Sequence, residues 1–229
     1  MKYLFIIPAR GGSKGIPKKN IFEINGHPLI YYSISAALEV KKILQDSKVI
    51  VSTDSQEIKE VSIKFGAEVP FIRPKELSDD KSKSIEYVNH AIKYFEENGV
   101  LFEHVVILQP TSPLRTFEDI LASIQTYETH KADSLISVYE EQTINEKIIY
   151  MQNGLYCKPA DQLHNAGIRR QEDESFLVRN GAIYITKIDF FREAQSLVSS
   201  KPLIYVMPKS KSINIDTPED MLMAEKLLI

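Results

Sequence analysis

The stretch Y-L-F-I-I-P-A-R-G-G-S-K-G-I-P-K-K-N, residues 3–20, joins an unbroken apolar run to a glycine-rich, basic loop. The apolar run, residues 3–8, is typical of a strand that is buried on both faces of a parallel sheet. It ends at a proline, and the loop follows at once. Ligands of parallel sheets bind beyond the carboxyl ends of the strands. The stretch therefore predicts a buried first strand with a ligand-binding loop at its carboxyl end.

Short apolar runs and amphipathic stretches alternate along the rest of the chain. Further strands are predicted at residues 48–54, 67–72, 104–108, 133–139, 181–186, 202–207 and 212–216, and helices at residues 28–40, 55–65 and 83–98, after Thr116 and after Thr217. Thr116 with Asp119, and Thr217 with Pro218, are residue types that begin helices. This alternation predicts an α/β fold with a mainly parallel sheet and helices on both faces.

The alternation breaks at about residues 140–178. Residues 148–157 have the pattern of a hairpin with Asn153 and Gly154 at its turn, and the polar run Q-E-D-E-S follows at residues 171–175. We interpret residues 1–229 as one domain, with an excursion at about 140–178 that leaves the main sheet.

The composition limits the classes of protein to consider. The 229 residues are 43% hydrophobic and 26% charged, with a net charge of −3, which suits a globular enzyme better than a nucleic-acid-binding protein. The lone Cys157 cannot form an intrachain disulfide, so the chain fits a reducing compartment. The apolar run at residues 3–7 is too short for a signal peptide, and no apolar stretch approaches the ~20 residues of a membrane span. We expect a soluble, cytoplasmic protein.

The loop after the first strand has the features of a polyphosphate site. Its glycines are Gly11, Gly12 and Gly15, and its cations are Arg10, Lys14, Lys18 and Lys19. Glycines let the backbone approach a ligand closely, and the cations match phosphate charge. The loop fits neither the Walker pattern nor G-x-G-x-x-G, so a P-loop or dinucleotide fold is disfavoured.

The same loop resembles the signature of the acylneuraminate cytidylyltransferases, the CMP-sialic acid synthetases, which reads approximately [LP]-A-R-x-x-S-K-[GR]-[LIV]-x-x-K-N. Further family landmarks recur in order: V-S-T-D (51–54), R-P-K-E-L-S-D-D (73–80), L-Q-P-T-S-P-L-R (108–115), R-N-G-A-I-Y-I (179–185) and I-D-T-P-E-D (215–220). They cover nearly the whole chain. The resemblance implies a three-layer, Rossmann-like nucleotidyltransferase fold in which the excursion is a small inserted dimerisation subdomain.

The resemblance also implies a CTP site. Its nucleotide-binding residues are Ala9, Arg10, Gly11, Ser13, Lys14, Gly15, Lys19, Asn20, Arg73, Ser84 and Gln109. The loop residues are expected at the triphosphate and ribose, and Arg73 and Ser84 at the cytosine ring, which a short hydroxyl can read. For Ser84 a plain helix-start role remains an alternative, and for Arg115 an ion pair with a nearby carboxylate.

The implied sugar-binding residues are Gln109, Arg170, Gln171, Asn180 and Tyr184. A planar guanidinium suits a sugar carboxylate through two parallel hydrogen bonds. The family has a leucine-proline spacer after Arg-Gln, and this chain has Q-E-D-E-S-F-L-V-R instead. Both Arg170 and Arg179 are therefore candidates for the carboxylate, with Arg170 preferred. Core packing is the alternative for Tyr184.

The last predicted strand carries the implied metal site. Alternation places Asn214 and Asp216 on one face. The family usually has Asp at both positions, facing the metal and the triphosphate. Mg²⁺ prefers anionic oxygen, so Asp216 is the expected ligand, and Asn214 offers only a neutral carbonyl. We therefore expect Mg²⁺ to be bound more weakly, or with more water ligands, than at a site with two aspartates. The alternative for Asp216 is a charge that complements a helix dipole.

The implied reaction is CTP plus a sialic-acid-type nine-carbon acid, giving the CMP-sugar and pyrophosphate in a cytoplasmic homodimer. The predicted catalytic residues are Arg10, Lys19 and Asp216, and no general base stands out, so metal-assisted deprotonation is the hypothesis. Two alternatives stay open: the same chemistry on legionaminic, pseudaminic or an eight-carbon acid, and a nucleotide-binding module without turnover. The histidines show no metal-ligand spacing.

Overall fold

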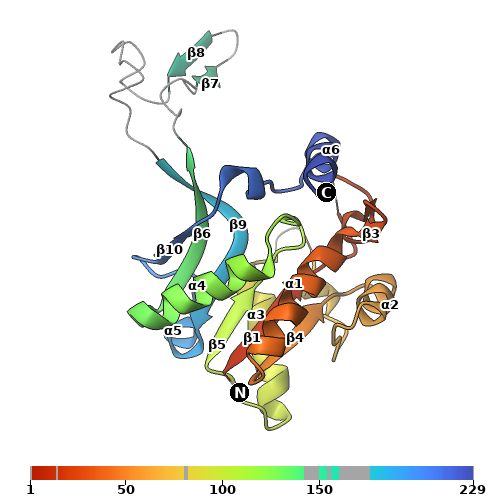
Figure 1. The fold of residues 1–229 in the computed structure, drawn as a ribbon, viewed down its shortest axis with the longest axis vertical. Coiled ribbons are helices and arrows are strands. Elements are labelled where there is room, and N and C mark those ends of the chain that lie inside the picture. Colours follow the sequence, from red (N-terminus) through yellow and green to blue (C-terminus); the bar gives the residue numbers. More distant parts are fainter. Residues whose placement is uncertain are drawn as a thin grey trace.

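A six-stranded sheet forms the centre of the protein (Figure 1). The structure, a computed structural model, describes residues 2–13, 15–79, 82–141, 150–153, 156–159 and 176–228. In spatial order the strands are β10 (Leu203–Val206), β6 (Ser134–Glu141), β9 (Phe176–Lys187), β5 (His104–Ile107), β1 (Tyr3–Pro8) and β4 (Ser47–Ser52). Five of the six are parallel, and β9 runs antiparallel between β5 and β6.

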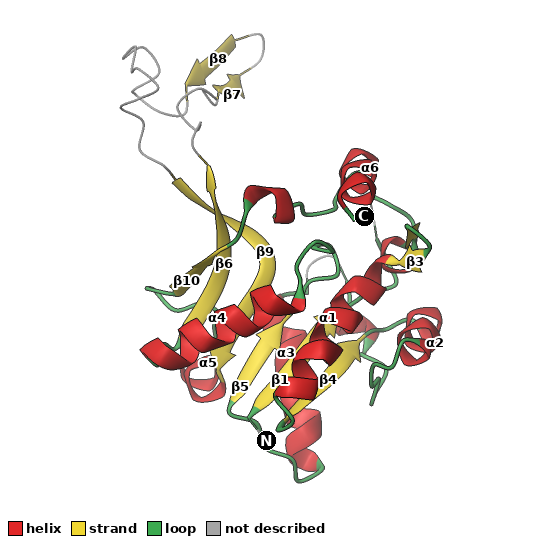
Figure 2. Ribbon diagram, viewed as in Figure 1, coloured by secondary structure: helices red, strands yellow, loops and turns green. Residues whose placement is uncertain are grey.

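Helices cover both faces of this sheet (Figure 2). They are α1 (Leu29–Ile43), α2 (Gln56–Lys64), α3 (Ser84–Glu97), α4 (Phe117–His130), α5 (Ile188–Ala194) and α6 (Pro218–Leu227). Side chains of β1 alternate between two cores: Phe5 and Ile7 pack with α1 and α4, whereas Leu4 and Ile6 pack with α3 and α5. The apolar run of β1 is thus buried on both faces, and the predicted three-layer, mainly parallel fold is confirmed.

The helix starts follow the predicted signals. Thr116 caps α4 in a capping box with Asp119, and Thr217 caps α6 in a capping box with Asp220, with Pro218 in the first turn. In both boxes the threonine hydroxyl accepts from a backbone N–H that the helix leaves unpaired, while the carboxylate accepts from the threonine N–H. Within the described residues no helix is long and apolar enough to cross a membrane.

Two predicted strands are wrong. Residues 67–72 contribute only a single bridge, from Glu68 to Ile50, because Pro70 lacks an N–H and the chain then turns away from the sheet edge. Residues 212–216 form no strand either. They follow the 3₁₀ helix Lys209–Lys211 and cross the carboxyl edge of the sheet, with one backbone bond from Ile215 N to Thr111 O at 2.8 Å.

The direction of β9 follows from the excursion. The chain leaves the sheet after Glu141, at the carboxyl end of β6. It returns with Phe176 of β9 paired to Glu141, so β9 must run antiparallel to β6. The predicted hairpin is present as β7 (Tyr150–Asn153) paired with β8 (Tyr156–Pro159), and in Figure 1 it stands off from the body of the domain. Gly154 of the predicted turn lies outside the described residues.

A small third core brings the two ends of the chain together at the carboxyl edge. Ile16 of the first loop and Ile215 of the last loop are both buried in it, against Met221 and Ala224 of α6. Burial of these apolar side chains places the flanking polar residues, about 200 positions apart in sequence, next to one another. The short β2 (Glu23–Ile24) and β3 (His27–Pro28) form a hairpin beside this core.

Candidate active site

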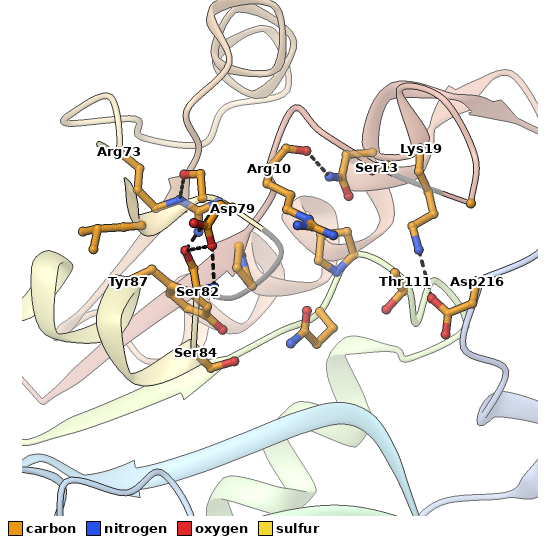
Figure 3. A pocket seen from close by; sticks show the side chains of 17 residues that line it. Arg10, Ser13, Lys19, Arg73, Asp79, Ser82, Ser84, Tyr87, Thr111 and Asp216 are labelled. Atoms are coloured by element: carbon orange, nitrogen blue, oxygen red, sulfur yellow. Dashed lines mark hydrogen bonds and ion pairs between the residues drawn. The ribbon is translucent and has the colours of Figure 1, made fainter. Parts of the chain in front are cut away.

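A pocket of about 450 Å³ opens at the carboxyl ends of β1 and β5 (Figure 3). It is lined by Pro8, Arg10, Ser13, Gly15, Lys19, Asn20, Arg73, Leu77, Ser78, Asp79, Ser82, Ser84, Tyr87, Gln109, Pro110, Thr111 and Asp216. Nine of the predicted nucleotide or metal residues are in this lining. Ala9 and Gly11 lie behind it in the loop, and Lys14 lies outside the described residues.

Side-chain hydrogen bonds hold the glycine-rich loop around the pocket. Gly11 N donates to Asp54 Oδ1 at 2.8 Å, and the buried Asn20 donates from Nδ2 to the Arg10 carbonyl at 3.0 Å. The Asp of V-S-T-D therefore fixes the loop from β4. Asn20, predicted with the other loop residues at the triphosphate and ribose, directs its amide group to the loop backbone in this structure.

Gly15 is needed for a close approach of two backbones. A Cβ atom at this position would lie 2.6 Å from the carbonyl oxygen of Asp216, well inside van der Waals contact. At Gly12 the same atom would meet nothing within 4 Å. The glycine-rich loop and the last loop can therefore touch only because residue 15 has no side chain.

Lys19 and Asp216 form an ion pair at one end of the pocket (Figure 3). Lys19 Nζ donates to Asp216 Oδ1 at 3.0 Å and to the Ile215 carbonyl at 2.8 Å. The lysine side chain is 15% exposed, whereas that of Asp216 is 65% exposed. Neighbouring Lys18 turns outward to Glu57 at 2.8 Å and is absent from the pocket lining. Of the two adjacent lysines, only Lys19 lies at the site.

The capping box of α6 orients Asp216. The carboxylate of Asp220 accepts from the backbone N–H of Asp216 at 3.0 Å and of Thr217 at 2.8 Å. Although partial burial acts to raise it, these donors hold the pKa of Asp220 below its usual range. Asp220 thus stays ionised near neutral pH and fixes the backbone from which Asp216 projects.

The opposite end of the pocket is built around Arg73. This buried side chain donates from Nε to Ser78 Oγ at 2.8 Å, and its guanidinium lies 5.4 Å from the ring centroid of Tyr87. Burial lowers the pKa of Arg73. Ser84, the first residue of α3, is exposed at the pocket wall. An aromatic face, a guanidinium and a hydroxyl are suited to a planar base.

Sequence reasoning missed several lining residues: Asp79, Ser82, Tyr87 and Thr111. Asp79 and Ser82 bind one another, with Ser82 N donating to Asp79 Oδ1 at 2.7 Å, and so close the loop before α3 (Figure 3). The pattern D-x-x-S, in which a carboxylate caps a nearby N–H, was the available signal. Tyr87 had none, because its place on α3 reads as an ordinary core position.

A second pocket of about 600 Å³ adjoins the first. It is lined by Gln109, Thr111, Tyr139, Val178, Arg179, Asn180, Gly181, Tyr184, Ser212, Asn214 and Asp216. Gln109, Thr111 and Asp216 line both pockets. The two cavities therefore share a wall that carries an amide, a hydroxyl and a carboxylate.

Within the second pocket, Asn180 is committed to the protein. The buried side chain accepts from Ser137 Oγ at 2.6 Å and from Ala182 N at 3.1 Å, and donates to Ser212 Oγ at 2.9 Å. It ties β9 to β6 and to the loop before Asp216. Its predicted role at the sugar stays a prediction.

Tyr184 and Arg179 also border the second pocket, and Arg179 is exposed. Among the described residues, no carboxylate forms an ion pair with the Arg179 guanidinium. Arg170, the preferred candidate for the carboxylate, and Gln171, also predicted at the sugar, lie outside the described part of the chain. Arg179 is thus the candidate for the carboxylate that the structure does place at this pocket.

Asn214 and Asp216, the two predicted metal ligands, both line the second pocket. Asn214 Nδ2 donates to Asp216 Oδ2, so the two predicted ligands are in contact although they are not on a strand. In the described ranges there is no group of three His, Cys, Asp or Glu residues that could enclose a metal. One exposed carboxylate fits Mg²⁺, which is usually held by one or two carboxylates together with substrate phosphates and water.

Known proteins resemble this chain along its whole length. The family model for cytidylyltransferases matches residues 4–227. CMP-N,N'-diacetyllegionaminic acid synthase of Legionella pneumophila is 36% identical over 234 residues, which cover 100% of this chain and 97% of the relative. N-acylneuraminate cytidylyltransferase of Streptococcus agalactiae is 31% identical over 229 residues, which cover 97% of this chain and 52% of that longer protein.

A solved structure supports the fold. CMP:2-keto-3-deoxy-manno-octonic acid synthetase, in complex with CTP, superposes with a TM-score of 0.71 at 19% identity, covering 100% of this chain and 98% of that one. The sequence match and the fold lead to one conclusion: the chain belongs to the cytidylyltransferase family, and the protein is a nucleotidyltransferase.

Proposed function

We propose that the protein transfers CMP from CTP to the anomeric hydroxyl of a nine-carbon 2-keto-3-deoxy sugar acid and releases pyrophosphate. The observation that carries this proposal is the wall shared by the two pockets, with Gln109, Thr111 and Asp216. A nucleotide in the first pocket and a sugar acid in the second would meet there. Holding both reactants in line supplies much of the rate enhancement for such a transfer.

In the first pocket, the nucleotide would lie between the two ends already described. The cytosine ring would contact Tyr87, Arg73 and Ser84, and the triphosphate would extend toward Arg10 and Lys19. The Lys19 ammonium, which bonds Asp216 in this structure, is placed to bind a phosphate oxygen instead. Neutralising charge on the phosphates as the bond to pyrophosphate breaks is the main chemical work of such a site.

In the second pocket, the sugar acid would lie against β9. Arg179 supplies a guanidinium for the carboxylate, and Tyr184 a hydroxyl and an aromatic edge. Arg170 remains the alternative for the carboxylate. The relatives named for N,N'-diacetyllegionaminic acid and N-acylneuraminate favour a nine-carbon acid of this class for the present chain.

We further propose that Mg²⁺ acts with this enzyme and that Asp216 holds it, with Asn214 beside it. When bound there, the ion would neutralise phosphate charge and lower the pKa of the attacking hydroxyl. The linings of both pockets hold two carboxylates, Asp79 and Asp216, and Asp79 is tied to Ser82. This supports deprotonation of the hydroxyl without a dedicated general base.

Because CTP is a cytoplasmic metabolite, we propose that the enzyme is cytoplasmic. From the family resemblance we also propose that it is a homodimer.

A substrate panel tests the function. Purified protein with Mg²⁺ would be incubated with CTP, ATP, GTP or UTP and with N-acetylneuraminic, N,N'-diacetyllegionaminic, pseudaminic or 2-keto-3-deoxyoctonic acid, with pyrophosphate release as the readout. We expect release with CTP and at least one nine-carbon acid. Release only with the eight-carbon acid, or only with another nucleotide, would contradict the proposal, as would no release with any pair.

Substituting Asn214→Asp is expected to lower the Mg²⁺ concentration for half-maximal activity by about 3–10-fold, because a second carboxylate raises the ligand charge at the site. The measurement is a Mg²⁺ titration of pyrophosphate release at saturating CTP. Asn98→Asp, which adds the same charge at the end of α3 remote from both pockets, is the matched control. An unchanged or higher Mg²⁺ requirement in Asn214→Asp would argue against metal binding next to residue 214.

A further inference from the structure

Arg115, the last residue of L-Q-P-T-S-P-L-R, is buried directly behind the shared wall of the two pockets. Only 2% of it is exposed. Its Nη1 donates to the carbonyl oxygens of Gln109 at 3.2 Å and Ala182 at 2.9 Å, and its Nη2 donates to Ser33 Oγ at 2.7 Å. One side chain therefore joins the loop after β5, strand β9 and helix α1.

This guanidinium has no carboxylate partner within hydrogen-bonding distance among the described residues, contrary to the ion pair considered from the sequence. Asp119, the carboxylate whose charge acts on Arg115, is itself bound by Lys211 at 3.1 Å and by the Thr116 N–H at 2.9 Å. Burial lowers the pKa of Arg115 to about 10, and the charge of Asp119 acts in the opposite sense. Burying a cation against neutral acceptors is costly, so a core position alone explains it poorly.

Two of the three acceptors of Arg115, the Gln109 and Ala182 carbonyls, are backbone groups that set the geometry of the pockets. Gln109 lines both cavities. Its carbonyl also accepts from Ser33 Oγ at 3.3 Å and from the backbone N–H of Ser112 at 3.2 Å, so two side-chain donors and one backbone donor fix this peptide group. Ala182 lies on β9 between Gly181 and Tyr184, which line the second pocket. Movement of either carbonyl would change the distance between the nucleotide and the sugar acid.

We propose that Arg115 is a positioning residue. It fixes the position of Gln109 relative to β9, so that the two substrates meet in line. The inference rests on the proposed function and extends it to a residue that touches neither pocket. Without Arg115 the Gln109 carbonyl keeps Ser33 and Ser112 as donors, whereas β9 loses the bond from the guanidinium to Ala182. Loss of Arg115 should therefore disturb the sugar acid more than CTP. Misplacement by about 1 Å can cost ~10²-fold in rate.

The test compares Arg115→Met, Arg115→Lys and Ser33→Ala, with Ser134→Ala as the matched control. Ser33 and Ser134 are both fully buried serines whose hydroxyls make two hydrogen bonds, and Ser134 bonds Ser199 at the other end of β6. The measurements are kcat and KM for the most active sugar acid in the panel, the Kd for CTP by calorimetry, and Tm.

We expect Arg115→Met to lower kcat/KM for the sugar acid by about 10²-fold and to change the CTP Kd by less than about 3-fold. Arg115→Lys should recover part of the loss, and Ser33→Ala should lose about 3–10-fold, near the effect of one hydrogen bond. Ser134→Ala should lower Tm like Ser33→Ala but leave kcat/KM within about 2-fold of the wild type.

Two results would overturn the inference. One is a Ser33→Ala protein with wild-type kcat/KM, which decides the matter even if the Arg115 variants do not fold. The other is an equal loss of kcat/KM in Ser33→Ala and Ser134→Ala, in proportion to the fall in Tm. That result is expected if Ser33 and Arg115 only stabilise the fold. Both results can be obtained only if the wild-type protein is active. Failure of the proposed function is therefore distinguished from failure of this inference, because the wild type would then be inactive in the substrate panel.

Discussion

Lys19→Ala is expected to lower kcat/KM by about 10²–10³-fold, the usual loss when one preorganised group that stabilises transition-state charge is removed. The lysine is the cation at the Asp216 end of the first pocket, with its Nζ 2.8 Å from the Ile215 carbonyl and 3.0 Å from Asp216 Oδ1. Initial rates of pyrophosphate release measure the loss. Tm should change little, because an ion pair to a largely exposed carboxylate contributes little to stability.

Lys18→Ala is the control for this experiment, since it removes the same charge from the adjacent position. Lys18 is exposed and pairs with Glu57 on α2, away from the pocket lining. We expect its kcat/KM to stay within about 2-fold of the wild type, as for an exposed ion pair. Equal losses in the two variants would mean that the loop contributes only diffuse positive charge and that Lys19 has no special place in the reaction.

Gly15→Ala is expected to cost about 10²-fold in kcat/KM although it changes no charge or hydrogen-bonding group. The new Cβ would lie 2.6 Å from the Asp216 carbonyl oxygen, a contact with backbone that no rotamer change can relieve. The glycine-rich loop and the Asp216 loop must then move apart, and shifts of about 1 Å at reacting groups have effects of this size. Steady-state kinetics with CTP and Mg²⁺ would show the effect.

The matched control is Gly12→Ala in the same loop. A Cβ at Gly12 meets nothing within 4 Å, and Gly12 does not have a positive φ, so alanine should fit without strain. We expect near wild-type kinetics from Gly12→Ala. If Gly15→Ala were as active as Gly12→Ala, close contact between the two loops would not be required for catalysis.

Much of the fold could be predicted from the sequence because its signals are local. The continuous apolar run of β1 requires burial on both faces, and the capping residues Thr116 and Thr217 satisfy N–H groups a few positions away. These features depend on neighbouring residues, so a single chain is enough to read them. The same holds for the glycines and cations of the first loop.

The wrong strands show where local signals fail. Residues 67–72 and 212–216 have the composition of strands, yet a strand needs a partner edge along its whole length. The first segment turns away from β4 after one bridge, and the second is held across the sheet edge by the 3₁₀ helix Lys209–Lys211 and the α6 cap. Asn214 and Asp216 still meet, through a hydrogen bond instead of strand alternation.

At the site, the types of residue could be predicted from the sequence, but the direction in which each side chain points could not. Composition alone does not distinguish Lys18 from Lys19, and only the folded loop sends one to Glu57 and the other to Asp216. Likewise, Asn180 belongs to a family landmark, but its amide is used in bonds to Ser137 and Ser212. Such choices depend on acceptors that are distant in sequence.

By itself, the sequence determined the layered α/β fold, the phosphate-type loop and the family, since apolar periodicity, glycines and ordered motifs are written along the chain. The tertiary structure alone decided that Gly15 touches Asp216, that two pockets share Gln109, Thr111 and Asp216, and that Arg115 lies buried behind them. The physical reason is that burial of Ile16 with Ile215, and pairing of β9 with β5 and β6, bring together residues that no local pattern connects.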